Sequence, residues 1–338
     1  MRRRARPTLL VFTLCSATAC SRAVVSVSPP GIPLPTATGG AVAQESFFSD
    51  VLGVRKRLVV YLPRSYMRES TRRYPVVYYL HGLSGSQGDW VSKGGIDGIA
   101  DSLFAANTPE MILVMPDGDD GWYTNWTSQF SYRTCADTVK GEWPESYCVE
   151  HQRYDEYIVR DVIGFVDSHY RTLATREHRG IAGLSMGGYG ALSLALHHPD
   201  MFAAAASHSG VVSPLYTGPR PFAEPAHYAL SAEELRSPAG SFWPRYQNFW
   251  GTDMARWRDA DPAHTAADLR ARGARMPALF FDCGVDDGFL DQNRALHSEL
   301  TKLGIAHQYA EWPGAHTWRY WSTHVRESLS WISAQVAR

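Results

Sequence analysis

The stretch Gly183-Leu184-Ser185-Met186-Gly187 decides how this chain is interpreted. It follows a short apolar run, 179–182, typical of a strand, and precedes a run, 188–196, typical of a helix. A serine at such a strand-to-helix junction lies on a sharp turn with its hydroxyl exposed, and small residues two positions away on either side avoid collisions with the turn. The amides that open the helix favour negative charge near the serine oxygen. The stretch therefore predicts a nucleophilic serine, Ser185.

A serine hydroxyl needs a base to remove its proton and an acid to orient that base. Ligands of such sheets collect at the carboxyl ends of the strands, so the candidates are residues that directly follow a predicted strand. His316 meets this criterion, as do Asp286 and Asp287, and the order serine, acid, histidine is that of an α/β-hydrolase. His208 also follows a strand and is the rival base. The residues thus predict His316 as the base and one of the two aspartates as the acid.

An ester attacked by a hydroxyl develops an oxyanion, which needs two backbone donors. One is the amide after the nucleophile, that of Met186. The other comes from the loop after an earlier strand, here His81-Gly82-Leu83-Ser84-Gly85. Gly82 lets the backbone turn close to a substrate. We therefore expect the amides of Leu83 and Met186 to form an oxyanion hole.

Apolar runs and helical periodicity alternate along most of the chain. Runs typical of strands lie at 55–62, 74–80, 111–115, 179–182, 202–206, 278–282 and 307–312. Helical patterns lie at 96–106, 154–170, 188–196 and 292–303, and a last one ends at 336. This alternation implies an α/β fold over 45–338, with a mostly parallel sheet and helices on both faces. A Pro-, Gly- and aromatic-rich segment, about 212–273, is interpreted as a cap inserted over the C-terminal edge of the sheet; within it, Asp261-Pro262 predicts the start of a helix.

The N-terminal segment differs from the rest. Arg2-Arg3-Arg4 precedes the apolar stretch 9–19, which ends in small residues, and this order is typical of a secretory signal peptide, here 1–20. Cys20 raises lipidation as a second interpretation. The Pro- and Gly-rich segment 21–44 is expected to be a flexible tether. We therefore expect an exported protein that is secreted, periplasmic or held at the cell surface.

Composition and cysteine spacing narrow the function further. The 338 residues include 33 Lys or Arg and 34 Asp or Glu, and the formal net charge of −1 gives no reason to expect nucleic-acid binding. The sequence contains neither a C-x-x-C pair nor an H-E-x-x-H motif, so it offers no strong metal site, and no cofactor is expected. Cys135 and Cys148 flank a polar stretch and are predicted to form a disulfide in an exported protein. Cys283 is expected to be a small buried side chain.

The loop 117–123, Asp-Gly-Asp-Asp-Gly-Trp-Tyr, follows another predicted strand. Its carboxylates lack the spacing of a calcium-binding loop, so a solvated loop is expected. Trp122 and Tyr123 are the candidates for surfaces that contact the substrate.

Several motifs together resemble the esterase D family, also called the Putative esterase family, of α/β-hydrolases. They are His81-Gly82-Leu83, Pro116-Asp117-Gly118 with Trp122-Tyr123, Gly183-Leu184-Ser185-Met186-Gly187-Gly188, Gly284-Val285-Asp286-Asp287 and Pro313-Gly314-Ala315-His316-Thr317-Trp318. The group includes feruloyl and acetyl-xylan esterases, S-formylglutathione hydrolases and the antigen 85 mycolyltransferases. The resemblance covers about 45–335. It implies Ser185, Asp287 and His316 as a triad, with Leu83 and Met186 as oxyanion donors, and Asp287 follows the family's Gly-x-x-Asp spacing.

Together with the predicted signal peptide, the resemblance implies an exported serine carboxylesterase that acts through an acyl-enzyme on a small-molecule, glycan or lipid ester. An acyltransferase that uses a sugar or lipid hydroxyl in place of water needs the same residues and is the alternative. Gly187-Gly188-Tyr189-Gly190 has the general esterase form rather than the Ala- and Ser-rich run of the mycolyltransferases. A non-catalytic binding module on the same scaffold is the third hypothesis, because fold does not imply function.

Overall fold

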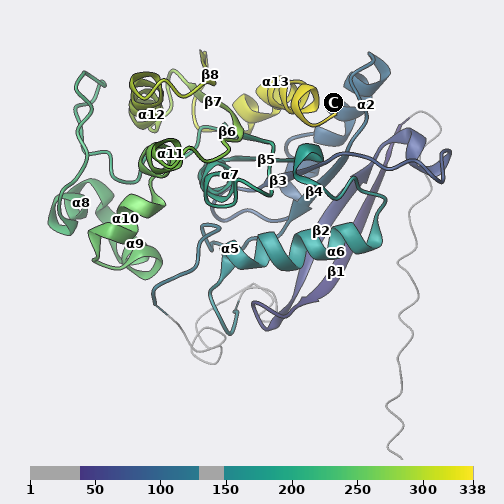
Figure 1. Ribbon diagram of the computed structural model, residues 1–338, viewed down its shortest axis with the longest axis horizontal. Helices are drawn as coiled ribbons and strands as arrows, with labels where there is room; N and C mark the ends of the chain where they lie inside the picture. The colour runs from purple at the N-terminus through teal and green to yellow at the C-terminus, as the bar shows by residue number, and fades with distance from the viewer. Residues whose placement is uncertain (1–38, 129–147, 338) are drawn as a thin grey trace, which may run out of the picture. The chain divides into compact units, whose positions relative to one another are not determined.

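The computed structural model describes residues 39–128 and 148–337, so the predicted signal peptide and the first part of the predicted tether lie outside it. In the described residues, eight strands form one sheet in the order β1-β2-β4-β3-β5-β6-β7-β8 (Figure 1). The strands are β1 (Ala41–Ser49), β2 (Val54–Leu62), β3 (Val76–Leu80), β4 (Ile112–Pro116), β5 (Arg179–Leu184), β6 (Ala204–His208), β7 (Ala278–Gly284) and β8 (His307–Trp312).

The sheet is antiparallel at one edge and parallel elsewhere. β1 pairs with β2, and β2 with β4, in antiparallel fashion. The remaining pairs, from β4 through β3, β5, β6 and β7 to β8, are parallel. The predicted mostly parallel sheet is therefore confirmed. The carboxyl ends of the parallel strands meet at one edge, which is where ligands bind in sheets of this kind.

Helices cover both faces of the sheet. They are α1 (Asp89–Ser92), α2 (Ile96–Ala105), α5 (Tyr154–Glu156), the π-helical η2 (Tyr157–Val162), α6 (Ile163–His169), α7 (Met186–His197), α8 (Ala232–Ala239), α9 (Trp243–Trp250), α10 (Met254–Ala260), α11 (Pro262–Ala271), α12 (Leu290–Lys302) and α13 (Trp318–Val336). Short 3₁₀ turns are η1 (Arg64–Met67), η3 (Arg176–His178) and η4 (Gly240–Phe242). The predicted helices at 96–106, 154–170, 188–196 and 292–303 are thus present, with small shifts of their ends.

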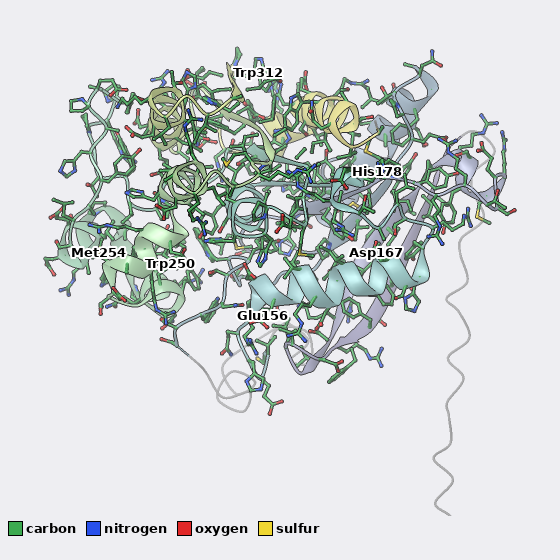
Figure 2. All side chains as sticks on the ribbon, viewed as in Figure 1. Glu156, Asp167, His178, Trp250, Met254 and Trp312 are labelled. Atoms are coloured by element: carbon green, nitrogen blue, oxygen red, sulfur yellow. The ribbon has the colours of Figure 1, made fainter. Side chains whose placement is uncertain are left out.

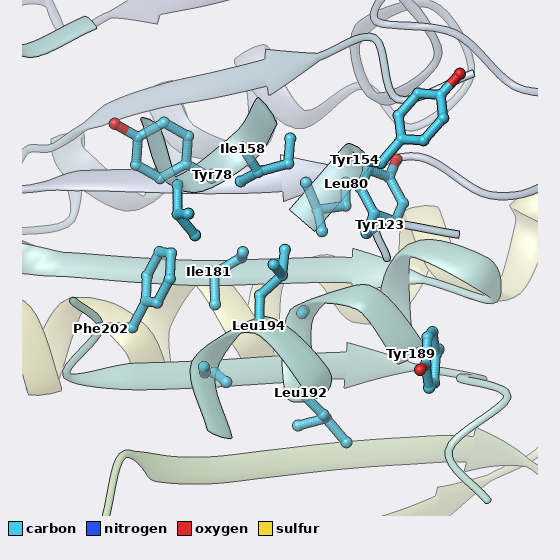
Figure 3. Close-up of a cluster of buried hydrophobic side chains, with 14 of the residues drawn as sticks. Tyr78, Leu80, Tyr123, Tyr154, Ile158, Ile181, Tyr189, Leu192, Leu194 and Phe202 are labelled. Carbon is cyan, nitrogen blue, oxygen red and sulfur yellow. The ribbon is translucent and has the colours of Figure 1, made fainter. Parts of the chain in front are cut away.

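The two faces of the sheet carry separate apolar cores because side chains alternate along each strand. Val77 and Tyr79 pack with α2 and α13 on one face. Tyr78 and Leu80 pack with α6 and α7 on the other, together with Ile181 of β5 (Figure 3). Burial of each such side chain contributes roughly 1.5–3 kcal/mol, so the strand sequences themselves require a helix layer on both sides.

Strand β1 includes residues 41–44, which the sequence pattern assigned to the tether, so that boundary is wrong. Side chains of β1 alternate between buried and exposed, with Ala41, Ala43 and Phe47 facing the core. Glu45 is also buried and accepts a hydrogen bond from the Tyr170 hydroxyl at 2.7 Å. The strand was missed because all of its inward positions except Phe47 are small or polar, which gives a weak apolar alternation.

The segment after β6 is an insertion, but a shorter one than predicted. Helices α8, α9 and α10 form an aromatic-rich group to the side of α7 (Figure 1). In this group, the ring centroids of Trp250, which is labelled in Figure 2, and Trp257 lie 4.7 Å apart. Helix α11 instead packs on α7 and α12, through small buried residues such as Ala263 and Ala266, so the predicted cap end at 273 is too late. The predicted start of α11 is confirmed, because Asp261 caps it by accepting the Ala263 N–H at 3.1 Å.

Within the described ranges, none of the helices combines the length and apolar character that a membrane crossing requires.

Candidate active site

Ser185 lies between β5, which ends at Leu184, and α7, which begins at Met186. Its φ of 53° lies in the left-handed region, which is strained for a residue other than glycine. The Ser185 N–H donates to the carbonyl oxygen of His208 on β6 at 2.9 Å, which holds the turn against the neighbouring strand. The residue is 8% exposed. This geometry presents the hydroxyl at the carboxyl edge of the sheet, as the sequence predicted.

The glycines around Ser185 are required by close backbone contacts. A Cβ on Gly187 would lie 2.4 Å from the carbonyl oxygen of Leu80, and a Cβ on Gly183 would lie 2.3 Å from the carbonyl oxygen of Gly187. Both distances are far below van der Waals contact. The turn therefore needs glycine at position 187 because the end of β3 passes directly against it, and at position 183 because the backbone of Gly187 does.

Ser185, His316 and Asp287 form a chain of hydrogen bonds although they are far apart in the sequence. His316 Nε2 lies 2.9 Å from Ser185 Oγ, and His316 Nδ1 lies 2.9 Å from Asp287 Oδ2. A carboxylate only accepts, so Nδ1 carries the proton, and Nε2 of the neutral ring accepts from the Ser185 hydroxyl. Asp287 is itself oriented, because its Oδ1 accepts the Phe289 N–H at 2.9 Å. The arrangement suits removal of the serine proton and stabilisation of the resulting imidazolium.

The side chains of Asp286 and His208, the alternative acid and the alternative base, lie away from the Ser185 hydroxyl. Asp286 is exposed to solvent, whereas Asp287 is buried. His208 is fully buried, with Nδ1 2.6 Å from Asp282 Oδ2 and Nε2 2.7 Å from Ser328 Oγ. Its ring is therefore engaged on the far side of the serine turn. The structure brings Asp287 and His316 to Ser185, and it does not bring Asp286 or the His208 ring there.

The predicted oxyanion loop lies next to the serine. A Cβ on Gly82 would be 3.4 Å from the Cβ of Ser185, so the backbone passes the nucleophile closely. In the described part of the chain, the amides of Leu83 and Met186 have no acceptor within the protein. Both residues also line a cavity beside Ser185. Two unpaired N–H groups are thus available near the serine oxygen, which is what an oxyanion requires.

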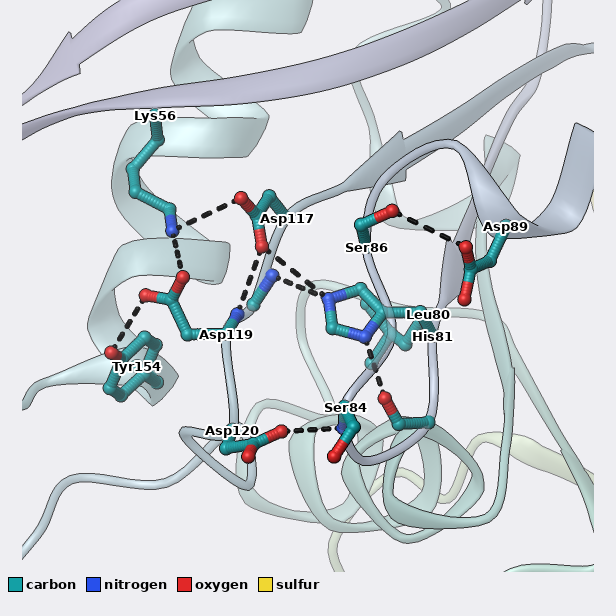
Figure 4. A network of polar contacts seen from close by, with 12 residues as sticks. Lys56, Leu80, His81, Ser84, Ser86, Asp89, Asp117, Asp119, Asp120 and Tyr154 are labelled. Carbon is teal, nitrogen blue, oxygen red and sulfur yellow. Dashed lines mark hydrogen bonds and ion pairs between the residues drawn. The ribbon is translucent and has the colours of Figure 1, made fainter. Parts of the chain in front are cut away.

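The loop before Leu83 is braced by a buried histidine. His81 Nδ1 lies 2.8 Å from the Gly82 carbonyl oxygen, and its Nε2 lies 2.9 Å from the Gly118 nitrogen (Figure 4). A carbonyl only accepts and an amide only donates, so the ring is neutral with its proton on Nδ1. His81 therefore links the loop after β3 to the loop after β4.

The expectation of a solvated loop at 117–123 is wrong. Asp117 and Asp119 are buried, and Lys56 Nζ lies 3.5 Å from Asp117 Oδ2 and 2.6 Å from Asp119 Oδ1 (Figure 4). Burial alone would raise the pKa of Asp117, but the Lys56 charge holds it below its usual range. Burial raises the pKa of Asp119 to about 7, although Lys56 and the Tyr154 hydroxyl, 2.8 Å away, both favour its charged form. The loop turns inward because a buried ammonium needs carboxylate partners.

The prediction that Tyr123 contacts the substrate is also wrong. Tyr123 is fully buried, and its hydroxyl donates to the His81 carbonyl oxygen at 3.1 Å. Its ring occupies the space beside Gly190 of α7, where a Cβ would lie 2.5 Å from a ring carbon. Trp122 is 2% exposed but does line the cavity beside Ser185. Of the two aromatic residues, only Trp122 is placed to meet a ligand.

Two cavities meet at Ser185. The Met186 cavity has a volume of about 210 Å³ and the His316 cavity one of about 630 Å³. Met186 lines only the first and His316 only the second. The residues that line both are Leu83, Ser185, Phe242 and Phe289. The site thus offers a separate space on each side of the serine.

The sequence analysis did not identify three residues of the site, Phe289, Phe242 and Lys56. Phe289 could have been found from its position two residues after Asp287, at the same strand end. Phe242 had no such signal, because the conformation of the insertion that carries it is set by tertiary packing. Lys56 could have been found as a charged residue at an inward position of an alternating strand, between Val54 and Leu58.

No metal site is apparent in the described residues, where no group of three or more His, Cys, Asp or Glu side chains is arranged to hold an ion. Cys283 is buried, and burial raises the pKa of its thiol, so it is not suited to act as a nucleophile. Cys148 is buried and disulfide-bonded. Cys135 lies outside the described residues, so the predicted pairing stays a prediction.

The serine turn follows β5, the aspartate follows β7 and the histidine follows β8, and this placement on a mostly parallel sheet is that of the α/β-hydrolases. The family described as Putative esterase matches residues 49–332. The chain belongs to this family, as the motifs predicted.

Comparison with known proteins agrees with this assignment. An esterase of Mycobacterium tuberculosis is 30% identical over 282 residues, which cover 81% of this chain and 55% of that protein, so the chain spans about half its length. An acetyl esterase of Caldicellulosiruptor saccharolyticus is 24% identical over 305 residues, which cover 87% of this chain and 98% of that protein. The solved structure of a ferulic acid esterase is similar with a TM-score of 0.63 at 26% identity, covering 88% of this chain and 99% of that one.

Proposed function

We propose that this protein is a serine carboxylesterase that works through an acyl-enzyme intermediate. The observation that carries the proposal is the pair of 2.9 Å contacts that joins Ser185 to His316 and His316 to Asp287. Membership of the Putative esterase family and the esterase names of its relatives support the same chemistry.

The first half-reaction follows from the geometry. Ser185 Oγ bonds to the ester carbonyl carbon while its proton passes to His316 Nε2, and Asp287 stabilises the imidazolium that forms. The negative carbonyl oxygen is bound by the amides of Leu83 and Met186. The bond from carbon to the alcohol oxygen then breaks, and His316 gives its proton to that oxygen. The alcohol leaves, and the acyl group stays on Ser185.

Water completes the reaction. His316 Nε2 takes a proton from water as its oxygen bonds to the acyl carbon, and the proton then returns to Ser185 Oγ as the acyl–serine bond breaks. The product is a carboxylic acid, and no cofactor enters the sequence of steps.

An acyltransferase is the second candidate, because an alcohol can replace water in the second half-reaction. The His316 cavity supports keeping it, since a space of about 630 Å³ beside the base has room for an acceptor alcohol. Product analysis with added trehalose, glycerol or glycan separates the two. Transfer of the acyl group to the added alcohol supports the acyltransferase, and release of free acid alone argues against it.

Export is part of the proposal and rests on the sequence of residues 1–20. A basic start, a short apolar stretch and small residues before Cys20 are the supporting features. Fractionation of cells that express the full chain tests it. A comparison with Cys20→Ala by labelled-lipid incorporation distinguishes a lipid anchor from free secretion, and a protein that stays unprocessed in the cytoplasm would contradict export.

The esterase proposal is tested with p-nitrophenyl esters of acetate and butyrate and with a fluorophosphonate probe. The wild-type protein should hydrolyse the esters and be labelled by the probe, whereas Ser185→Ala should do neither. Equal rates or equal labelling of the two proteins would refute the proposal. Absence of labelling in the wild-type protein would favour the non-catalytic module instead.

A further inference from the structure

The position of His316 assigns the two cavities to the two halves of an ester, if the protein acts as proposed above. The carbon of the tetrahedral intermediate bears Ser185 Oγ, the oxyanion, the alcohol oxygen and the acyl chain. His316 Nε2 must reach both Ser185 Oγ and the alcohol oxygen, so the alcohol leaves on the His316 side. The acyl chain points away from the base. The Met186 cavity, which His316 does not line, is therefore the space for the acyl chain.

The Met186 cavity is mostly apolar and aromatic. Trp122, Leu235, Tyr246 and Trp257 line it, so it suits a hydrocarbon or ring portion of an acyl chain. Among the described residues, its lining contains one charged side chain, that of Arg220, and no carboxylate. Within the described lining, the one formal charge is therefore positive.

Arg220 is free to bind a ligand. It is exposed, and in the described part of the chain no carboxylate lies within 4.0 Å of its guanidinium. Asp291 is on the helix that borders the cavity but does not line it. Its Oδ1 accepts the Phe222 N–H at 2.6 Å, and its carboxylate makes no ion pair with Arg220. A guanidinium without a protein partner at the edge of an apolar space is suited to a planar anion such as a carboxylate.

A second wall residue also presents a donor. Gln292 is buried and lines the cavity, and its Oε1 accepts the Ser213 N–H at 3.2 Å. Because the side-chain oxygen is used by the protein, the group that Gln292 can offer a ligand is its NH₂, which only donates. Arg220 and Gln292 therefore both favour an acceptor, and preferably a negative one, on the acyl chain.

We propose that the acyl group this esterase prefers carries a carboxylate at its far end, so that its substrates are monoesters of dicarboxylic acids, with Arg220 as the specificity-determining residue. The apolar middle of the acyl chain lies against the aromatic wall, and the terminal carboxylate is bound by the Arg220 guanidinium. Hydrolysis follows the steps above and releases the alcohol and the free diacid. The proposal rests on the esterase function and adds the class of acyl group.

The test compares matched ester pairs with one leaving group. Mono-p-nitrophenyl esters of succinic, glutaric, adipic and suberic acid are set against p-nitrophenyl esters of the monocarboxylic acids of equal chain length. The measured quantity is the ratio of kcat/KM for the acid-tailed ester to that for its neutral partner. We expect this ratio to exceed one at the best-fitting length and to fall about fivefold to tenfold in Arg220→Gln, the range of one partly exposed charge-assisted contact. It should also fall with added salt, because an exposed charge pair is screened.

Arg236→Gln is the matched control. Arg236 is another exposed arginine of the insertion, next to the lining residue Leu235, but it does not line the cavity. The ratio of kcat/KM values for Arg236→Gln should equal that of the wild-type protein. The variant Arg220→Lys should keep part of the preference for the acid-tailed ester. A wild-type preference for neutral or phenolic acyl chains at every length, or a ratio that Arg220→Gln leaves unchanged, would overturn the acyl assignment while leaving the esterase function intact. Absence of Ser185-dependent hydrolysis of every ester would instead reject the esterase function itself.

Discussion

The amide of Ser185 donates to the carbonyl oxygen of His208 at 2.9 Å, so the histidine that rivalled His316 in the sequence contacts the nucleophile through its backbone. Its ring points to Asp282 and Ser328 instead. The Tyr320 hydroxyl also donates to Asp282, at 2.8 Å, which ties this buried group to the start of α13, just after His316. The two histidines therefore have different parts in the site, one structural and one chemical.

This difference predicts separate effects for two substitutions. His316→Gln should lower kcat/KM on p-nitrophenyl acetate by about 1,000-fold or more, because among the described residues no other base contacts Ser185 Oγ. His208→Gln keeps a hydrogen-bonding side chain and the backbone carbonyl, so the folded protein should stay within about tenfold of wild type. Circular dichroism establishes the folded fraction of each variant. A folded His208→Gln protein that is less active than His316→Gln would contradict the assignment of the base.

The adjacent aspartates provide a matched pair. Asp287→Asn should lower kcat by about 1,000- to 10,000-fold, because an amide no longer fixes the imidazole tautomer or stabilises its charged form. Asp286→Asn changes an exposed side chain next to it and should alter kcat less than about twofold. Steady-state kinetics of both proteins decides between them. Similar losses in the two variants would mean that the loop, and not the Asp287 carboxylate, is what matters.

Substitution by alanine should be harmful at one helical glycine and stabilising at another. Gly187→Ala places a Cβ 2.4 Å from the Leu80 carbonyl oxygen, so the serine turn must shift, and fluorophosphonate labelling of Ser185 should slow about 100-fold or more. Gly164 of α6 has open space around its Cβ position, and Gly164→Ala should raise the free energy of unfolding by up to ~1 kcal/mol. Normal labelling of a Gly187→Ala protein would show that the turn tolerates displacement.

Lys56 is predicted to matter more for stability than an exposed lysine. Lys56→Met leaves Asp117 and Asp119 buried without their cation and should lower the free energy of unfolding by about 3–5 kcal/mol. The control is Lys93→Met, since Lys93 is 49% exposed and its ion pair with Asp89 should contribute less than about 1 kcal/mol. Urea denaturation measures both. Adding Asp119→Asn to Lys56→Met should restore part of the loss, and equal effects of the two lysines would refute a buried network.

The raised pKa of Asp119 predicts how stability changes with pH. The carboxyl shifts from its usual 3.8 to about 7 in the folded protein, so between these values the folded state holds a proton that the unfolded state has lost. Its contribution to stability is present at low pH and is lost as the pH rises from about 4 to about 7. Asp119→Asn removes this contribution, so the difference in free energy of unfolding between wild type and variant should change in the same window. A difference that is constant from pH 4 to pH 8 would contradict the raised pKa.

The parts of the site that the sequence predicted are those encoded by short motifs at strand ends. Ser185, Asp287 and His316 each follow a predicted strand, and parallel pairing alone brings such ends to one edge. Strand β1 was missed because all of its inward positions except Phe47 are small or polar. Tyr123 and the 117–119 carboxylates were misplaced because their burial depends on partners far away in the sequence, Gly190 and Lys56, which no local pattern connects to them.

The sequence by itself determined the class of fold, the nucleophile and the order of the three side chains around it, because strand and helix periodicity and the glycine-flanked serine are local properties. Only the tertiary structure showed which side chains meet. Asp287 contacts His316 while its neighbour Asp286 is exposed, and His316 reaches Ser185 while the His208 ring is held by Asp282 and Ser328. The tertiary structure alone also placed Arg220 at the edge of the acyl cavity. The conformation of the insertion that carries this arginine depends on contacts between aromatic side chains, and these contacts form only when the chain is folded.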